Sequence, residues 1–248
     1  MDRNKIVKFC EEYLKVKDFK DFCHNGLQVE GAADVTKIIT GVTISQKLIE
    51  AAISKKAQMI MVHHGLFVKY LGDMPEIKGV WRNRLKMLLA NDINLVGFHL
   101  PLDAQPEIGN NISICRLLGI TANVQPIDVG FIGELPKPMA FTDFVSLVKE
   151  KINPQVNALN GGNNMVKKIG VISGGASPDI HLIAEAGADT FLAGDIRESV
   201  VRPIEELQMN FINAGHYNTE TFGIKNLGEL VAKEFGVEVE FVDIPCEI

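Results

Sequence analysis

The sequence has few cysteines, no long apolar run and no excess of basic residues, and each absence excludes a class of protein. Its four cysteines form no CxxC pair, so neither a disulfide framework nor a thiolate zinc site is expected, and they suit a reducing compartment. No apolar run approaches the ~18–20 residues that span a bilayer. The opening residues, MDRNKIVKFCEEYL, lack the apolar core of a signal peptide. We therefore expect a cytoplasmic protein with no membrane segment.

Basic residues are outnumbered, because 25 Lys and Arg stand against 31 Asp and Glu, for a net charge of -6. A protein that mainly grips nucleic-acid phosphates needs basic patches, so nucleic acid is disfavoured as a partner, although net charge does not exclude a local basic surface. The 248 residues are 46% hydrophobic and 23% charged, as in globular proteins. At roughly 150 residues per domain, they predict one large domain or two small ones.

Short apolar runs alternate with amphipathic helical segments along most of the chain. This alternation predicts an α/β fold with mixed, largely parallel sheets flanked by helices. The Pro- and Gly-rich segment 123–139 interrupts it and is a candidate boundary with a hairpin-like connection. Strands are expected at 37–42, 59–62, 93–98, 166–172, 190–193, 210–214 and 237–242, and helices at 46–55, 80–90, 111–118, 141–151, 178–186, 199–207 and 221–235.

Two parts of the chain can be aligned with each other. Residues 38–42 match 169–173 at an offset of 131, and residues 98–99 match 215–216 at an offset of 117. The difference between the two offsets corresponds to an extra loop in the first half, expected over Phe67–Val80. Such colinear matches predict an internal duplication. We expect two similar α/β domains, residues 1–125 and residues 126–248.

Four of the six histidines follow predicted strands, and acids recur at a fixed spacing after two of them. The pattern His99-x-x-x-Asp103 returns as His216-x-x-x-Glu220. In open α/β sheets, ligands bind beyond the carboxyl ends of the strands. The remaining pair is His63-His64, two neighbours that can face one site only if the chain turns, as the following glycine permits.

These residues offer the donors of a metal centre. The imidazoles of His63, His64 and His216 and the carboxylates of Asp103 and Glu220 suffice for two metals that share a bridging carboxylate and keep open positions for water. Such ions, ~3.5–4 Å apart, lower the pKa of a bridging water and produce a hydroxide nucleophile. A metal-free acid-base cleft of His with Asp or Glu is the alternative.

A glycine turn in the second half allows two interpretations. Gly174-Gly175 lies between a strand and a helix and can cradle an anion, or it forms a tight turn with Ser177 as N-cap and Pro178 at the first helical position. Asp195 stands where the repeat places His64 and borders the expected site. The roles of Asp195, Glu198 and the glycine turn stay open.

Five segments together give the chain a specific resemblance. The sequence resembles the YbgI/Nif-three-like family of dinuclear metal proteins, whose members are named GTP cyclohydrolase 1 type 2 homologues, over nearly its whole length. The carriers are Asn25-Gly26-Leu27-Gln28-Val29-Glu30-Gly31, His63-His64-Gly65-Leu66-Phe67, His99-Leu100-Pro101-Leu102-Asp103 with Gly109-Asn110-Asn111, Ser173-Gly174-Gly175-Ala176, and Gly215-His216-Tyr217 with Glu220 and Phe222-Gly223.

The resemblance implies a ligand set and an assembly. It implies two divalent metal ions held by His63, His64, Asp103, His216 and Glu220, with Glu220 bridging and His99 close by in a catalytic or supporting place. It implies that the metal site lies in the cleft between the two domains, and that the chain assembles with itself as a homohexameric ring of dimers. The chain departs from the family at His24, Val68 and Asp195, which puts the identity of its substrate in doubt.

Three functions are compatible with this reading. The first is a metal-dependent hydrolase that uses a metal-bridging hydroxide on an unknown small molecule, in GTP cyclohydrolase 1 type 2-like, nucleotide or phosphoester chemistry. The second is a metal carrier, for example an iron chaperone for cofactor assembly. The third is a ring-shaped scaffold for a protein or nucleic-acid partner. The nitrogen and oxygen donors suit Fe, Mn, Zn, Co or Ni, and the sequence leaves open which metal is bound and whether the protein is an enzyme.

Overall fold

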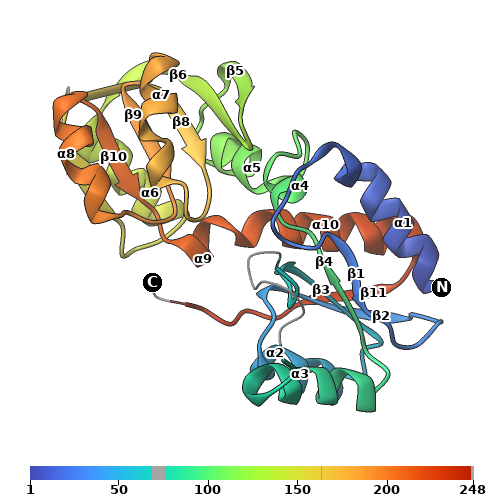
Figure 1. Ribbon diagram of the computed structural model, residues 1–248. Helices are drawn as coiled ribbons and strands as arrows, with labels where there is room; N and C mark the ends of the chain where they lie inside the picture. Colours follow the sequence, from blue (N-terminus) through green and yellow to red (C-terminus); the bar gives the residue numbers. More distant parts are fainter. Residues whose placement is uncertain (69–75, 163, 247–248) are drawn as a thin grey trace. The chain divides into compact units, whose positions relative to one another are not determined.

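The structure is a computed structural model that describes residues 1–68, 76–162 and 164–246, and the chain divides into two compact units (Figure 1). The first unit comprises Met1–Leu102 and Gly223–Ile244. The second comprises Asp103–Phe222 and Pro245–Ile248. The predicted class is confirmed, because the chain is α/β with two mixed sheets flanked by helices. Part of the loop expected over Phe67–Val80 falls outside the described residues.

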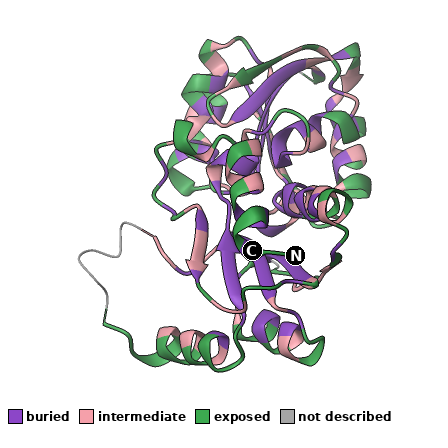
Figure 2. Ribbon diagram, turned by 90° about the vertical axis from the view of Figure 1, so that its right-hand side faces the viewer, coloured by how far each residue is buried: buried purple, intermediate pink, exposed green. Residues whose placement is uncertain are grey.

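The sheet of the first unit has the strand order β1-β4-β3-β2-β11. Strands β4, β3, β2 and β11 run parallel, and β1 pairs antiparallel with β4 at one edge. The central strands are buried along most of their length (Figure 2), as expected for parallel strands covered on both faces. The strands are β1 (Gly26–Val29), β2 (Lys37–Thr43), β3 (Met59–His64), β4 (Asn94–Gly97) and β11 (Glu238–Phe241); the helices are α1 (Arg3–Tyr13), η1 (Val16–Asp18), α2 (Gln46–Ser54), α3 (Gly79–Ala90), α4 (Leu100–Asp103) and most of α10 (Thr221–Phe235).

Helices cover both faces of this sheet. On one face, Leu48 of α2 and Leu88 of α3 join a buried cluster with Ile39 of β2. On the other face, α10 approaches closely at Gly228, where a Cβ would lie 3.0 Å from Val239 Cγ1 and 3.1 Å from Thr40 Cγ2. The apolar runs that the sequence shows at these strands are therefore explained by burial on both sides.

The sheet of the second unit has the strand order β5-β6-β8-β9-β10-β7. Strands β8, β9 and β10 run parallel, with β7 antiparallel at one edge and the β5–β6 hairpin at the other. This hairpin is the connection predicted in segment 123–139. The strands are β5 (Ala122–Ile127), β6 (Gly130–Ala140), β7 (Asn157–Asn160), β8 (Met165–Ile172), β9 (Thr190–Ala193) and β10 (Asn210–Asn213); the helices are α5 (Asn110–Leu117), α6 (Phe141–Lys151), η3 (Ser177–Asp179), α7 (Ile180–Glu185), α8 (Glu198–Glu206) and α9 (His216–Thr219).

The core of the second unit also has two layers. Cys115 of α5 and Phe144 of α6 pack against one face of the sheet. Ile183 of α7 and Ile204 of α8 pack with Phe191 against the other. The helices that follow β8 and β9 thus cover one face, while the helices that precede β5 and β7 cover the opposite face.

The two sheets repeat the same pairing, which supports the predicted duplication. Ile38 of β2 pairs with Met59 of β3, and Ile169 of β8 pairs with Thr190 of β9, each residue 131 positions later. Hydrogen bonds repeat as well. The side chain of Gln58 accepts from the backbone N–H groups of Thr36 and Lys37, and the carboxylate of Asp189 accepts from those of Lys167 and Lys168, at the same offset.

The strand register corrects the second offset. Asn94 pairs with Met59, and Asn210 pairs with Thr190, so β4 and β10 correspond at an offset of 116 rather than 117. His99 therefore matches Gly215, and His216 comes one residue later. Gly215 has a φ of +91°, and this left-handed residue accommodates the extra position before α9.

The division of the chain differs from the expected halves 1–125 and 126–248. Helix α5 and the β5–β6 hairpin belong to the second unit, because α5 packs on β6 and β6 pairs with β8. At the other end, the chain returns to the first unit, because β11 pairs in parallel with β2. Asp103, expected in the first domain, consequently lies in the second unit.

A buried side-chain amide at the start of β4 connects three backbone segments of the first unit and provides a test of the fold. Asn94 is fully buried. Its Nδ2 donates to the carbonyls of Ala32 (2.8 Å) and Gln58 (2.9 Å), and its Oδ1 accepts from Gly31 N–H (2.8 Å). We predict that Asn94→Leu lowers the free energy of unfolding by about 3 kcal/mol, because it leaves buried backbone groups unpaired. Urea unfolding measures this, and the exposed Asn91→Ala should change it by less than ~0.5 kcal/mol.

Candidate metal centre

Three histidines gather at the carboxyl edge of the first sheet. His63 and His64 end β3, and His99 follows β4. Because β3 and β4 are parallel and Val62 pairs with Gly97, the two strands end together. The ring centroids of His63 and His64 lie 4.6 Å apart, and that of His99 lies 5.0 and 5.5 Å from them. The three imidazoles predicted at strand ends of the first half are therefore neighbours.

Each of these imidazoles is anchored through its Nδ1 atom. His63 Nδ1 lies 2.9 Å from the Phe98 carbonyl, and His64 Nδ1 lies 2.9 Å from Thr43 Oγ1. His99 Nδ1 lies 3.0 Å from Asp21 Oδ1 and 3.2 Å from Oδ2. A carbonyl or carboxylate acceptor favours the proton on Nδ1, so the neutral rings of His63 and His99 have their lone pair on Nε2. This arrangement is typical of metal-ligating histidines.

The three side chains can hold a metal ion. One ligand atom from each of them lies within 4.8 Å of the others. His63 is 1% exposed and His99 8% exposed, while His64 is half-buried. A further group of Asp21, Cys23 and His99 satisfies the same distance limit. Burial on one side and partial exposure at His64 leave an ion shielded by protein yet accessible from solvent.

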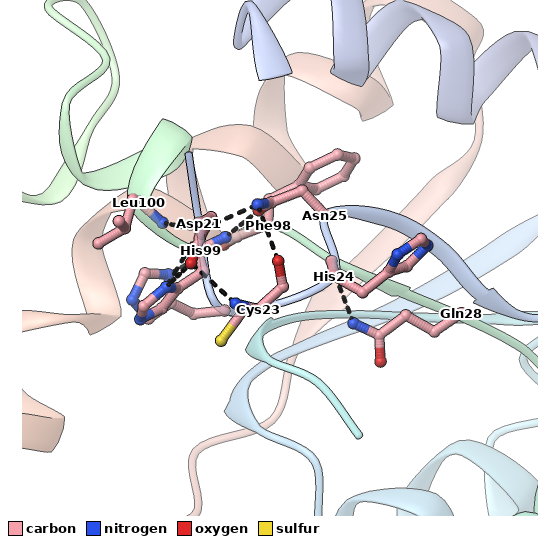
Figure 3. A network of polar contacts seen from close by, with 9 residues as sticks. Asp21, Cys23, His24, Asn25, Gln28, Phe98, His99 and Leu100 are labelled. Carbon is pink, nitrogen blue, oxygen red and sulfur yellow. Dashed lines mark hydrogen bonds and ion pairs between the residues drawn. The ribbon is translucent and has the colours of Figure 1, made fainter. Parts of the chain in front are cut away.

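Asp21 is the main functional residue that the sequence interpretation missed (Figure 3). Its carboxylate accepts hydrogen bonds from His99 Nδ1, from Asn25 Nδ2 (2.9 Å), and from the backbone N–H groups of Cys23 (2.9 Å) and Leu100 (3.0 Å). Asn25 closes the network, because its Oδ1 accepts from the backbone N–H of His99 at 2.7 Å. Asn25 belongs to the segment that carries the family resemblance, and its function here is to hold Asp21 and His99 together.

The same hydrogen bonds determine how Asp21 titrates. Burial opposes ionisation, but the bonds from His99, Asn25 and Cys23 outweigh it and hold the pKa of Asp21 well below its ordinary value of ~3.9. A lowered pKa in the folded state stabilises the fold above the ordinary pKa, and this contribution disappears as the pH falls toward the folded-state pKa.

We predict that Asp21→Asn lowers the free energy of unfolding by about 2 kcal/mol near neutral pH, because charge-assisted hydrogen bonds are lost. The difference from the wild type should shrink below about pH 4. Urea titrations at several pH values measure it. The exposed Asp18→Asn is the control and should change the free energy of unfolding at neutral pH by less than ~0.5 kcal/mol. A difference that is constant with pH would contradict the role assigned to the Asp21 charge.

In the second unit, Asp103 is held by three polar side chains. Its Oδ1 accepts from Asn110 Nδ2 at 2.8 Å and from Ser173 Oγ at 3.0 Å. Asn111 connects the two segments, because its Nδ2 donates to the Asp103 carbonyl (3.3 Å) and its Oδ1 accepts from Ser173 N–H (2.6 Å). Both asparagines are fully buried. Asp103 is thus oriented by Asn110, Asn111 and Ser173, which lie in segments that carry the family resemblance but had no role assigned from the sequence.

The second unit also brings His216 and Glu220 together. His216 Nε2 lies 3.2 Å from Glu220 Oε1, with the His216 side chain 40% and the Glu220 side chain 4% exposed. The Gly174 backbone lies directly against this pair, since a Cβ on Gly174 would be 2.3 Å from Glu220 Oε1 and 3.2 Å from His216 Nε2. The i, i+4 spacing predicted from the sequence therefore produces a contact.

The glycine turn confirms one part of its second interpretation and corrects another: Pro178 lies in the first turn of η3, but Ser177 is not the N-cap. Ala176 holds the N-cap position of η3, and the Ser177 hydroxyl accepts from Arg197 N–H at 3.2 Å. Asp195 accepts from Ser177 N–H at 3.4 Å. The position of Gly174 against Glu220 explains the glycine, because any side chain there would collide with the carboxylate. Glu198 is exposed at the start of α8.

These features define an α/β protein whose strand ends carry an imidazole-rich candidate metal centre. The chain belongs to the Duf34/NIF3 (NGG1p interacting factor 3) family, whose profile matches residues 1–247, and the predicted resemblance is confirmed. Among the described residues, no helix is long and apolar enough to cross a membrane.

Curated and solved relatives match over the full length. The GTP cyclohydrolase 1 type 2 homolog of Haemophilus influenzae is 43% identical over 98% of this chain and 98% of that protein. A solved structure described as protein ybgI, of unknown function, superimposes with a TM-score of 0.95 at 38% identity and covers 100% of both chains. Reduced HcgD from Methanocaldococcus jannaschii superimposes with a TM-score of 0.84 at 27% identity over 98% of each chain.

Proposed function

We propose that this protein is a metal-dependent hydrolase that holds two divalent ions with His63, His64, Asp103, His216 and Glu220. The observation that supports it best is the anchoring of the imidazoles in the first unit. His63 donates from Nδ1 to a backbone carbonyl, His64 Nδ1 contacts a threonine hydroxyl, and a ligand atom of each lies within 4.8 Å of the other. Metal-ligating histidines almost always have their other ring nitrogen hydrogen-bonded in this way.

The donor chemistry fits divalent ions of the first transition row. Imidazole nitrogen and carboxylate oxygen suit Fe, Mn, Zn, Co and Ni, and no thiolate is needed. When bound, such ions supply Lewis acidity and activate water near neutral pH. The protein's own contribution is orientation. Phe98 and Thr43 fix the rings of His63 and His64, while Asn110 and Ser173 fix the Asp103 carboxylate.

For the substrate, we propose a nucleotide or another phosphoester. The name GTP cyclohydrolase 1 type 2 homolog of the full-length relatives makes GTP the first compound to test. We also propose that the chain assembles with itself into a hexameric ring of dimers. Light scattering on the purified protein measures this directly, and a monomeric mass would contradict it.

The test is elemental analysis of protein purified without added metal, followed by an activity screen with that metal restored. We expect close to two metal ions per chain and hydrolysis of GTP or a phosphoester. Glu220→Gln keeps the shape of the side chain and removes its charge, so it should lose both metal and activity. Equal turnover by the wild type and Glu220→Gln would contradict the proposal. Metal that is bound, produces no turnover and passes to an acceptor protein would identify a carrier instead.

A further inference from the structure

His99 holds one nitrogen of its ring against Asp21 and leaves the other available to a ligand. Its residue is 8% exposed, and its Nδ1 is committed to the Asp21 carboxylate at 3.0 Å. Because that carboxylate accepts, the proton lies on Nδ1 and the lone pair on Nε2. Among the residues that the structure describes, none hydrogen-bonds to His99 Nε2. One ligand atom of His99 lies within 4.8 Å of one on His63 and one on His64, so a ligand held beside these two histidines can reach His99.

The orientation of the His99 ring is fixed on several sides. Exchange of the two nitrogens by a ring flip would break the bond to Asp21, whose carboxylate is itself held by Asn25 and Leu100. Phe22 packs edge-on against the ring, with centroids 4.9 Å apart and planes at 66°. The imidazoles of His63 and His64 lie on the ring at 5.0 and 5.5 Å. The ring is therefore presented in one tautomer and one orientation.

We propose that Asp21 is a positioning residue that holds His99 as the Nδ1–H tautomer, so that His99 Nε2 accepts a hydrogen bond from the ligand of the metal centre. This proposal rests on the proposed function, because it takes the five ligands named above as the metal donors. His99 then contacts the ligand rather than the metal. The ligand it recognises carries an N–H or O–H donor, such as a ring N–H of a substrate or an attacking water.

The tautomer is measurable without any activity. In full-length protein labelled with nitrogen-15 in its histidines, long-range proton–nitrogen correlation spectra distinguish the two neutral tautomers, and the spectrum of His99→Gln assigns the His99 signals. In the metal-free wild type, we expect the proton on Nδ1. Asp21→Asn should shift the His99 population toward the Nε2–H tautomer, because the amide can offer its own N–H to Nδ1. A wild-type His99 with its proton on Nε2, or a spectrum unchanged in Asp21→Asn, would overturn the proposal.

Metal content distinguishes a ligand contact from metal ligation. After loading with zinc, His99→Gln and Phe22→Leu should retain the wild-type zinc content, whereas His63→Ala should lose at least half of it. Loss of zinc in His99→Gln equal to that in His63→Ala would make His99 a metal ligand and overturn its assignment as an acceptor.

The same measurements separate this proposal from the proposed function. If His63→Ala retains all of its zinc, the proposed metal set fails, while the tautomer measurement still decides whether Asp21 positions His99. Circular dichroism melting of each variant identifies any loss of folding. If Asp21→Asn does not fold, Asn25→Ala replaces it, since Asn25 bonds both Asp21 and the backbone of His99. Asn25→Ala should then weaken the preference for the Nδ1–H tautomer, and an unchanged spectrum would count against the proposal.

Discussion

Gly174→Ala is expected to weaken metal binding by about 100-fold, although it removes no ligand. A Cβ on Gly174 would lie 2.3 Å from Glu220 Oε1, far inside van der Waals contact, and 3.2 Å from His216 Nε2. The Glu220 side chain is 4% exposed, so it has little room to move away. The collision therefore has to displace one of the two proposed ligands in the second unit. Titration calorimetry with zinc measures the change.

Gly187→Ala is the matched control for this substitution. Both glycines have a left-handed backbone, with φ of +65° at Gly174 and +77° at Gly187, so alanine costs about 1–2 kcal/mol of strain at either position. At Gly187, however, the nearest neighbour of a new Cβ is Lys168 Nζ at 3.5 Å, an ordinary contact. Gly187→Ala should thus lose stability but keep its zinc affinity. Equal affinities for the two variants would show that Gly174 matters only for the backbone.

The strand-end histidines were predictable because their signal is local. An apolar run that ends in polar side chains defines both a strand and its carboxyl edge, so His63, His64 and His99 could be placed before the structure was known. The repeated spacing of a histidine and an acid four residues later likewise indicated Asp103, His216 and Glu220, and the resemblance added their roles as metal ligands. In the second unit, the structure does bring His216 into contact with Glu220.

Asp21 was not predictable by the same reasoning. It lies outside the repeat and follows no strand, and its partner His99 is 78 residues away in the sequence. Only the tertiary structure brings the carboxylate of Asp21, which lies in a loop, to the Nδ1 atom of His99. Asn25 offered a weak signal, since it opens one of the segments that carry the resemblance, but the sequence does not show which groups it hydrogen-bonds.

The one-residue error in the repeat has a physical cause. In the sequence, His99 matches His216 because both are histidines that precede an acid by four positions. The sheet shows that strand pairing matches Phe98 with Ala214, since their N–H groups bond to Val62 and Ala193, residues at the first offset. The repeat defined by the site histidines is therefore one residue out of step with the repeat defined by strand pairing. Gly215 is the extra residue, and it lies just after β10.

Asn110→Ala tests whether the orientation of Asp103 matters for metal binding. Asn110 is fully buried and donates to Asp103 Oδ1 at 2.8 Å. Its removal leaves the carboxylate with fewer donors and more rotational freedom, so we expect a loss in zinc affinity of about 10-fold to 100-fold, the range for residues that orient metal ligands. The exposed Asn160→Ala in β7 is the control and should bind zinc like the wild type.

A double-mutant cycle with Ser173→Ala makes this prediction specific to the carboxylate. Ser173 Oγ donates to the same Asp103 Oδ1 at 3.0 Å, so the two side chains share one acceptor and their effects on zinc affinity should not add. If each change merely loosened the fold, both would lower the unfolding free energy and leave the affinity of the folded protein unchanged. A double variant whose affinity loss is smaller than the combined losses of the single variants would show that Asn110 and Ser173 act through Asp103. Additive losses would show instead that they act independently of it.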